Sequence, residues 1–158
     1  MQHNIYENPW LFNGKPFLPE DIKNFYGFVY KITNKLTGKA YIGRKYFYKS
    51  IKKKGKRRIY IESDWKDYYS SCDELKQDVN KFGKENFLRE IISLHETKGD
   101  TNYWENYELF RNNVLEAVDF KGEKLYYNNN IMNRYFIRKN KPVRLLSETY
   151  YGIQTINS

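Results

Sequence analysis

Cysteine is almost absent from this chain of 158 residues, in which Cys72 is the only one. A lone cysteine cannot form an internal disulfide, and with only two histidines present a zinc site of thiolate and imidazole ligands cannot be assembled. No segment approaches the roughly twenty apolar residues that a membrane span needs. The first residues also lack the basic and then apolar pattern of a secretion signal. We therefore expect a cytoplasmic protein with no disulfide and no membrane contact.

Acidic residues are missing from residues 44–58, where nine of the fifteen residues are lysine or arginine. The formal net charge of the chain is +9, so this segment alone equals the whole excess. Clustered positive charge attracts polyanions and raises their encounter rate. The plainer interpretation is that these residues form a solvated loop. The two interpretations are compatible, because a mobile basic loop can hold a phosphate backbone. A smaller basic patch follows at residues 134–144.

The length allows one domain with a real core and is too short for two. Two β-rich segments flank a turn built on Asn34 and Gly38, which is typical of a β-hairpin. Residues 86–95 are rich in β-branched and aromatic side chains and predict a third strand. We expect an α/β (α+β) fold with a small antiparallel sheet of three strands flanked by helices.

Two helices are predicted after the basic segment. Ser71 and Glu74 form a capping box that would begin a helix over about residues 72–82. Asp100-Thr101 offers the cap of a second helix, running to about Leu115. Apolar side chains at helical spacing predict its buried face, and they are Tyr103, Tyr107, Phe110 and Val114.

Residues 1–25 contain three prolines interleaved with aromatic residues. Proline interrupts helices and sheet ladders, so these residues are predicted to be an extended arm whose aromatics pack on the domain. An arm that contacts DNA is the alternative, but it holds few basic residues. The expected organisation is this arm, a domain over 26–130 with a basic insertion at 44–62, and a basic extension over 131–158.

Two tyrosine motifs stand on the predicted hairpin, Gly27-Phe28-Val29-Tyr30 and Tyr41-Ile42-Gly43. Either tyrosine alone is an ordinary strand residue in a chain with sixteen tyrosines. Their order and spacing, with the elements that follow, resemble the GIY-YIG nuclease family over roughly residues 27–130. The second motif matches letter for letter, whereas the first has its glycine one position further out.

The resemblance implies a metal-dependent DNA endonuclease that uses Mg2+ (or Mn2+), of homing type, phage-encoded and acting in the host cytoplasm. In such an enzyme Tyr30 would take or relay a proton from the attacking water, its phenol made more acidic by nearby cations. Tyr41 would orient the water or the phosphate.

The same resemblance implies that Glu105 binds the metal, with Glu108 as the competing assignment. Helical rotation alone would place Glu105 opposite the apolar stripe and in solvent. Asn128 would support the active site, and Asn129 is a close alternative.

The resemblance further implies that an arginine holds the scissile phosphate. Arg44, which follows the second motif directly, is the first choice, and Arg57 and Arg58 are the alternatives. The cations expected to contact the nucleic-acid backbone are Lys45, Lys49, Lys52, Lys53, Lys54, Lys56, Arg57, Arg58 and Lys66.

Two other functions stay open. One is a nucleic-acid-binding module of this fold that has lost catalysis, and the other is a nuclease directed at RNA. Duplex DNA is the expected partner. A single site must act twice to cut both strands, so a homodimer or sequential nicking is expected.

Overall fold

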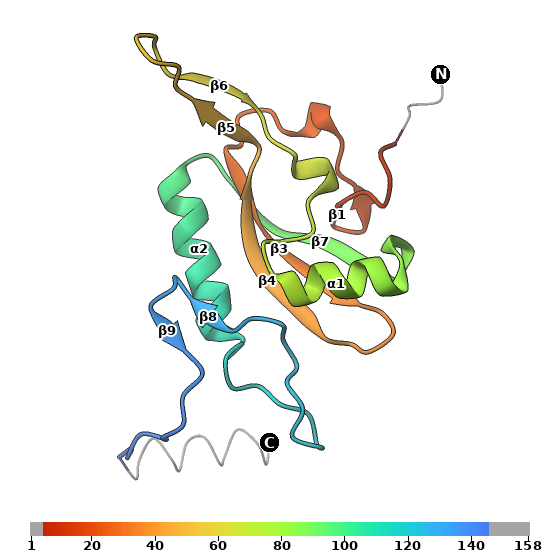
Figure 1. The fold of residues 1–158 in the computed structure, drawn as a ribbon, viewed down its shortest axis with the longest axis vertical. Helices are drawn as coiled ribbons and strands as arrows, with labels where there is room; N and C mark the ends of the chain where they lie inside the picture. The colour runs from red at the N-terminus through yellow and green to blue at the C-terminus, as the bar shows by residue number, and fades with distance from the viewer. Residues whose placement is uncertain (1–4, 146–158) are drawn as a thin grey trace.

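The computed structural model describes residues 5–145, and its centre is a five-stranded sheet (Figure 1). The strand order is β2-β1-β7-β3-β4. The central strands β3 (Gly27–Asn34) and β7 (Phe87–His95) are antiparallel, and β4 (Ala40–Tyr46) pairs antiparallel with β3 at one edge. The α/β class is confirmed, but the prediction of three strands is wrong.

The two additional strands come from the N-terminal segment. β1 (Leu11–Phe12) pairs parallel to β7, and β2 (Lys15–Pro16) forms the far edge of the sheet. Strands of two residues show no alternation in a sequence, and proline is tolerated only at a sheet edge. The prolines that predicted an irregular arm therefore also fit a short edge strand.

The aromatics of this segment are buried, as Trp10 and Phe17 both belong to the larger core cluster. The indole Nε1 of Trp10 donates a hydrogen bond to the carbonyl of Trp65 at 2.7 Å. The segment is thus part of the main core.

Two helices cover the sheet through separate core clusters. Leu75 and Val79 of α1 (Asp73–Phe82) pack into the larger cluster. Leu109 of α2 (Lys98–Arg111) packs into a second cluster with Val29 and Ile42. Because successive strand residues point to opposite faces, Tyr30 lies on the α1 side while its neighbour Val29 lies on the α2 side.

The predicted helix starts are displaced. The N-cap of α1 is Cys72, with no side-chain cap, so the predicted capping box at Ser71 does not form. The N-cap of α2 is Thr97, whose Oγ1 accepts a hydrogen bond from the Asp100 amide at 3.0 Å. Asp100 therefore lies in the first turn of α2.

The predicted buried face of α2 is wrong. Tyr103 is 63% exposed and Phe110 is 55% exposed, whereas the buried side chains are Thr101, Glu105 and Leu109. These three recur every four residues and so share one face. The face also packs closely, since a Cβ added to Gly27 would lie 3.1 Å from the Thr101 methyl.

The basic segment forms a β-hairpin instead of a loop. Residues 44–46 belong to β4, and the strands β5 (Tyr48–Ile51) and β6 (Ile59–Glu62) pair antiparallel beyond it. Figure 1 shows this hairpin projecting from the body of the molecule. Only residues 52–58 form its turn.

The remaining elements are short. They are the 3-10 helices Pro19–Asp21, Trp65–Asp67 and Lys84–Asn86 and the two-stranded pair β8 (Asn130–Ile131) and β9 (Tyr135–Phe136). Residues 146–158 of the predicted C-terminal extension lie outside the described residues. Across the described part of the chain, neither α1 nor α2 has the length and apolar character needed to cross a bilayer.

Candidate active site

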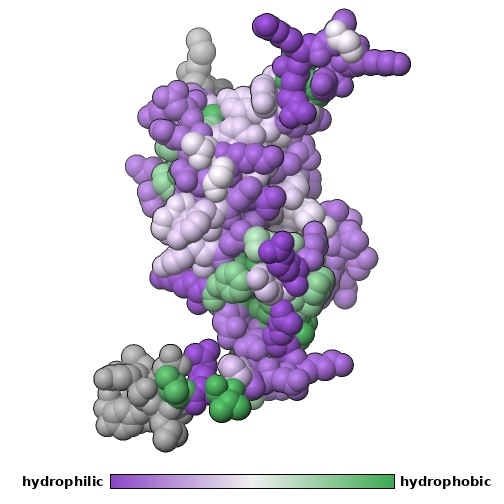
Figure 2. Space-filling model, turned by 90° about the vertical axis from the view of Figure 1, so that its left-hand side faces the viewer, coloured by the Kyte–Doolittle hydropathy of each residue, from purple (hydrophilic) through white to green (hydrophobic). Residues whose placement is uncertain are grey.

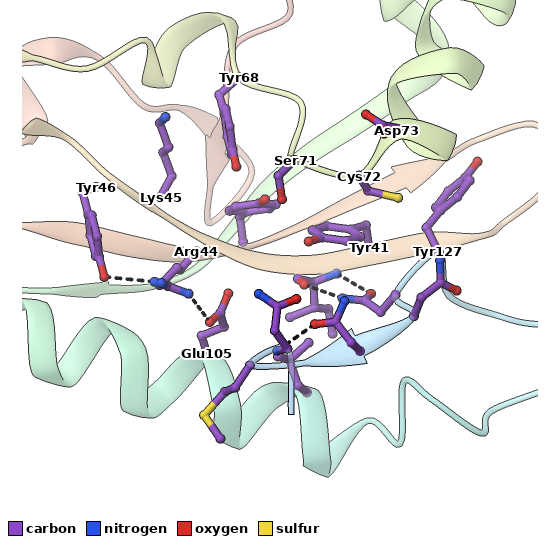
Figure 3. Close-up of a pocket in the computed structure, with 18 of the residues that line it drawn as sticks. Tyr41, Arg44, Lys45, Tyr46, Tyr68, Ser71, Cys72, Asp73, Glu105 and Tyr127 are labelled. Atoms are coloured by element: carbon purple, nitrogen blue, oxygen red, sulfur yellow. Dashed lines mark hydrogen bonds and ion pairs between the residues drawn. The ribbon is translucent and has the colours of Figure 1, made fainter. Parts of the chain in front are cut away.

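A cleft of about 780 Å3 lies along the exposed edge of β4 (Figure 3). Its walls come from β3, β4, the start of α1, the middle of α2 and residues 127–130. It therefore collects side chains that are far apart in the sequence. The predicted site residues that line it are Tyr30, Tyr41, Arg44, Lys45, Lys49, Glu105 and Asn128.

The two tyrosines of the motifs meet on the α1 side of β4. Tyr30 pairs across the sheet with Gly43, and the Tyr30 and Tyr41 rings stack with centroids 6.2 Å apart. A Cβ added to Gly43 would lie 2.6 Å from the Tyr30 hydroxyl oxygen. Glycine at this position therefore leaves the space through which the Tyr30 hydroxyl reaches the cleft.

Burial controls the acidity of both phenols. Tyr30 is only 1% exposed, and its burial, followed by the proximity of Tyr68 and Tyr41, raises its pKa well above 10. Burial likewise raises the pKa of Tyr41 to about 12. The expectation that nearby cations make Tyr30 more acidic is wrong for the free protein, because burial, the neighbouring phenols and the Glu105 carboxylate all raise the pKa of Tyr30. Both hydroxyls are protonated at neutral pH.

An ion pair between Arg44 and Glu105 lies on the other side of β4. Arg44 is two residues after Ile42 and so shares the face that packs on α2. Its Nη1 donates to Glu105 Oε1 at 2.7 Å, and its Nε donates to the Tyr46 hydroxyl at 3.0 Å. The Tyr46 hydroxyl in turn donates to Asn102 Oδ1 on α2. Figure 3 shows Glu105 rising from α2 towards Arg44.

The ion pair is partly buried, with Glu105 9% exposed. Burial raises the pKa of Glu105, and the neighbouring Arg44 guanidinium offsets part of that rise. Burial alone would lower the pKa of Arg44, but the Glu105 carboxylate raises it overall. The 2.7 Å contact between the guanidinium and the carboxylate favours the ionised pair.

Asn128 fastens residues 125–128 to the open edge of β4. Its Nδ2 donates to the Ile42 carbonyl at 2.8 Å, and its Oδ1 accepts from the Ile42 amide at 3.1 Å. The main chain beside it continues this pairing, since the Tyr127 amide donates to the Ala40 carbonyl at 2.7 Å. Asn129 instead accepts a hydrogen bond from Lys124 at 2.7 Å. Of the two candidate asparagines, Asn128 is therefore the one that is hydrogen-bonded to the second tyrosine motif.

The predicted cations are divided between the cleft and the hairpin. Lys45 lies in the cleft, 2.6 Å from an Asp64 oxygen and 3.9 Å from the centre of the Tyr68 ring. Arg57 and Arg58 lie at the outer end of the hairpin and are not among the cleft residues. Exposed on the hairpin with them are Lys52, Lys53, Lys54 and Lys56. Lys66, on the Trp65–Asp67 helix, lies 3.7 Å from Glu62 and is also outside the cleft.

The sequence did not single out Tyr46 or Tyr68, and it assigned Ser71 only a helix-capping role, but all three line the cleft. Ser71 lies in the cleft with Tyr41 and Tyr68 and lowers the pKa of both phenols, although burial raises each pKa overall. Tyr68 and Ser71 lie in a segment without periodic pattern, so the sequence held no signal that either residue reaches the cleft. Tyr46 could have been found by extending β4, because it follows Arg44 on the same face.

The chemistry of the donor groups decides which metal the cleft could hold. Among the described residues there is no cluster of three or more histidine, cysteine, aspartate or glutamate side chains fit for a metal. Glu105 offers one partly buried carboxylate beside the two phenols. Mg2+ prefers oxygen ligands and keeps several waters, so one carboxylate fits it, whereas zinc would need more protein ligands.

A family model described as "Putative endonuclease segE, GIY-YIG domain" matches residues 10–131. The chain belongs to the GIY-YIG endonuclease family. The match begins in the N-terminal segment and so takes in β1 and β2, which the resemblance from residue 27 onward did not cover. Comparisons with curated proteins and with solved structures gave no match.

Family membership identifies this GIY-YIG domain as an endonuclease domain, which hydrolyses phosphodiester bonds in a nucleic acid. The matched region includes both tyrosine motifs, Arg44, Glu105 and Asn128. It also contains the whole β5–β6 hairpin.

Proposed function

We propose that this GIY-YIG domain is a DNA endonuclease that depends on Mg2+ (or Mn2+). The observation that carries the proposal is the convergence in one cleft of a buried carboxylate, a guanidinium paired with it, and two protonated phenols. Phosphodiester hydrolysis needs a positioned water, positive charge at the phosphate and relief of charge on the leaving oxygen. The cleft residues fit these needs.

Glu105 would hold the metal ion. When bound, the ion would stabilise the negative charge that develops on the phosphate and on the leaving oxygen. Glu108 fits this role less well, because it is bonded to Asn112 and to Arg111 on its own helix.

Tyr30 would orient the attacking water and relay its proton. A protonated phenol accepts a hydrogen bond from the water through an oxygen lone pair. It can relay the proton of the water only if it passes its own proton to another acceptor. Tyr68, whose ring packs edge-on against that of Tyr30 with centroids 6.0 Å apart, would be such an acceptor and would pass its own proton to solvent in the cleft. Tyr41, which lines the cleft together with Ser71, would fix the position of the water or of the phosphate.

Arg44 would hold the scissile phosphate. Its recorded bonds to Glu105 and Tyr46 use two of the five guanidinium N–H donors, so others remain for phosphate oxygens. Arg57 and Arg58 are poorer candidates because both lie outside the cleft.

The biological setting proposed is that of a homing-type, phage-encoded nuclease acting in the host cytoplasm. This rests on the resemblance to small nucleases of the family and is an argument by analogy. The described residues hold one candidate active site, so cutting both strands would need a homodimer or two successive nicks.

RNA cleavage is the second candidate, and one observation favours it. Three aromatic side chains of α2 are exposed and could stack on unpaired bases, namely Tyr103, Trp104 and Tyr107. A catalytically inactive binding module is the third.

The central test is nicking of supercoiled plasmid DNA by the wild type and by Glu105→Gln, with and without Mg2+. We expect the variant to lose on the order of 100-fold or more in rate, because the amide removes the charge that holds the metal while keeping the shape of the side chain. Glu108→Gln, one turn further along α2, is the matched control and should keep most of the activity. Nicking that is unchanged by Glu105→Gln or by a chelator would refute the metal-dependent mechanism.

Competition separates the candidate substrates. Single-stranded RNA and duplex DNA are compared as competitors of plasmid nicking at one salt concentration. Stronger inhibition by RNA, together with cleavage of that RNA, would assign the activity to RNA. Binding of DNA without any cleavage would assign the chain to the inactive module.

A further inference from the structure

The β5–β6 hairpin continues directly from the strand that forms the cleft. β4 ends at Tyr46 and β5 begins at Tyr48, so only Phe47 separates them. Tyr48 and Lys49 at the base of the hairpin line the cleft itself. The hairpin and the candidate active site therefore form one continuous surface.

The base of the hairpin is fixed to the protein core. Phe47 and Trp65, which flank the two ends of the hairpin, are both fully buried, and their rings lie 5.3 Å apart. The Ser63 amide donates to the Phe47 carbonyl at 2.8 Å, and the Ser63 hydroxyl donates to the Tyr46 carbonyl at 2.6 Å. The direction in which the hairpin projects is thus set by the core.

The hairpin carries seven cations and one acid over residues 48–62. All seven cationic side chains are exposed, and at the top of Figure 2 the hairpin stands out as mostly hydrophilic side chains. Clustered charges of one sign repel one another, so the surface is best accounted for by an anionic partner. Its turn holds six of the cations, at Lys52, Lys53, Lys54, Lys56, Arg57 and Arg58.

The two faces of the ribbon are different. The cross-strand pairs Lys49–Ile61 and Ile51–Ile59 put three isoleucines and a lysine on one face. The opposite face carries the hydroxyls of Ser50 and Tyr60, which are paired with each other. Neither face has a core against it, since Ile59 and Tyr60 are more than half exposed. Hydroxyls bond base edges, and aliphatic groups contact the thymine methyl.

We propose that the β5–β6 hairpin enters the major groove of duplex DNA beside the scissile phosphate. This rests on the proposed function, in that DNA is taken as the substrate. A strand of four residues spans roughly 13 Å, and paired strands lie about 4.8 Å apart. The major groove of B-DNA is about 12 Å wide and about 8.5 Å deep and admits a two-stranded ribbon.

The proposal predicts a preference among nucleic acids. The major groove of A-form duplex RNA is too deep and narrow for side chains to read, and single strands have no groove. The cations of the turn then contact phosphates on both sides of the groove. Duplex DNA should therefore gain the most from the hairpin.

The first measurement is the affinity for a 30-base-pair DNA duplex in the presence of a chelator, so that no cleavage is needed. The triple variant Lys53→Gln, Lys54→Gln, Arg57→Gln is compared with Lys15→Gln, Lys81→Gln, Lys121→Gln, which removes the same charge from exposed positions outside the hairpin and the cleft. We expect the hairpin variant to lose on the order of tenfold or more in affinity for duplex DNA, with a slope of log K against log salt smaller by about 2 to 3. The control should lose much less. Equal losses, or an equal loss of affinity for duplex RNA, would overturn the proposal.

The second measurement identifies the groove. In a Cys72→Ser background, which keeps a residue suited to the N-cap of α1, Lys53→Cys is offered a duplex with an activated disulfide tether. The tether is attached either to cytosine N4 in the major groove or to guanine N2 in the minor groove. We expect crosslinking at least several-fold faster with the cytosine tether, and none with Lys121→Cys.

Equal or faster crosslinking to the guanine tether would refute the major-groove assignment. Because neither measurement involves hydrolysis, these failures are distinct from a failure of the Glu105→Gln test. If Glu105→Gln abolishes cleavage but the hairpin measurements fail, the proposed endonuclease function stands. Only the inference about the β5–β6 hairpin is then refuted.

Discussion

The burial that raises the pKa of Tyr30 and the absence of a side chain at Gly43 belong to the same packing of the Tyr30 ring against β4. The Tyr30 ring is buried on the α1 side of the sheet, yet its hydroxyl must reach a cleft along the edge of β4. It does so across the Cα of Gly43, where a methyl group would lie 2.6 Å from its oxygen. The residue type at position 43 thus determines where the phenol oxygen of residue 30 can be.

Gly43→Ala should therefore lower nuclease activity by about tenfold or more, because Tyr30 is packed on every other side and can only move away from the cleft. Plasmid nicking under single-turnover conditions measures the loss.

Gly99→Ala is the matched control for this substitution. A Cβ at residue 99 meets no atom within 4 Å, and alanine favours the helix that contains it. The control should keep its activity and have an equal or slightly higher melting temperature. Unchanged activity in Gly43→Ala would show that the position of the Tyr30 hydroxyl does not limit the reaction.

At the scale of elements, the buried face of α2 carries a candidate site residue and is not the face that the hydrophobic pattern of the helix predicts. The aromatic stripe of Tyr103, Tyr107 and Phe110 predicts the buried face by periodicity, but these side chains are exposed. The face against the sheet instead carries Thr101 and Glu105. A carboxylate is accommodated there because Arg44 of β4 pairs with it.

Two alanine substitutions on adjacent residues test this orientation of α2. Leu109→Ala should lower the free energy of unfolding by about 2 to 4 kcal/mol, since the side chain is only 4% exposed. Phe110→Ala should cost about 1 kcal/mol or less although the removed side chain is larger. Urea denaturation of both variants gives the comparison. A larger loss for Phe110→Ala would mean that the helix is rotated to bury its aromatic stripe.

Most of the central elements could be predicted from the sequence, because their signals are local. The hairpin of β3 and β4, the strand β7 and the helix α1 follow from alternation, turn residues and helical spacing, within a residue or two at the ends. The two strands of the N-terminal segment could not, since strands of two residues carry no periodicity. Which face of α2 is buried depends on Gly27 and Arg44, which lie on other elements. No pattern within the helix therefore predicts it.

Some residues of the candidate site could be predicted from the sequence alone, and others could not. Tyr41 and Gly43 form a motif that can be read directly, whereas Glu105 was selected only through the family resemblance. Tyr68 reaches the cleft through tertiary packing alone. The basic hairpin was recognised by its charge, but its ordered ribbon form was not, because a run of lysines hides the weak alternation of its strands.

At the scale of the whole molecule, the N-terminal segment and the candidate site share a core. The Trp10 ring lies 5.0 Å from the ring of Tyr30 and 5.1 Å from that of Phe28. Its indole also bonds the carbonyl of Trp65, at the base of the hairpin. One buried side chain thus connects the first strand, the phenol of the cleft and the base of the β5–β6 hairpin.

Trp10→Ala should therefore affect stability and catalysis together. A fully buried tryptophan replaced by alanine costs about 3 to 5 kcal/mol, which lowers the melting temperature of a domain of this size by roughly 6 to 20 °C. Since the cavity lies against Tyr30, nicking should also fall in assays kept well below the melting transition.

Trp10→Phe retains most of the packing but leaves the Trp65 carbonyl without its donor, so it should give a smaller loss of both stability and nicking. Phe120→Ala, at a side chain that is 94% exposed, should change the free energy of unfolding by no more than about 0.5 kcal/mol and leave nicking intact. If Trp10→Ala melts lower yet nicks at the wild-type rate, the N-terminal segment stabilises the fold without positioning the phenol.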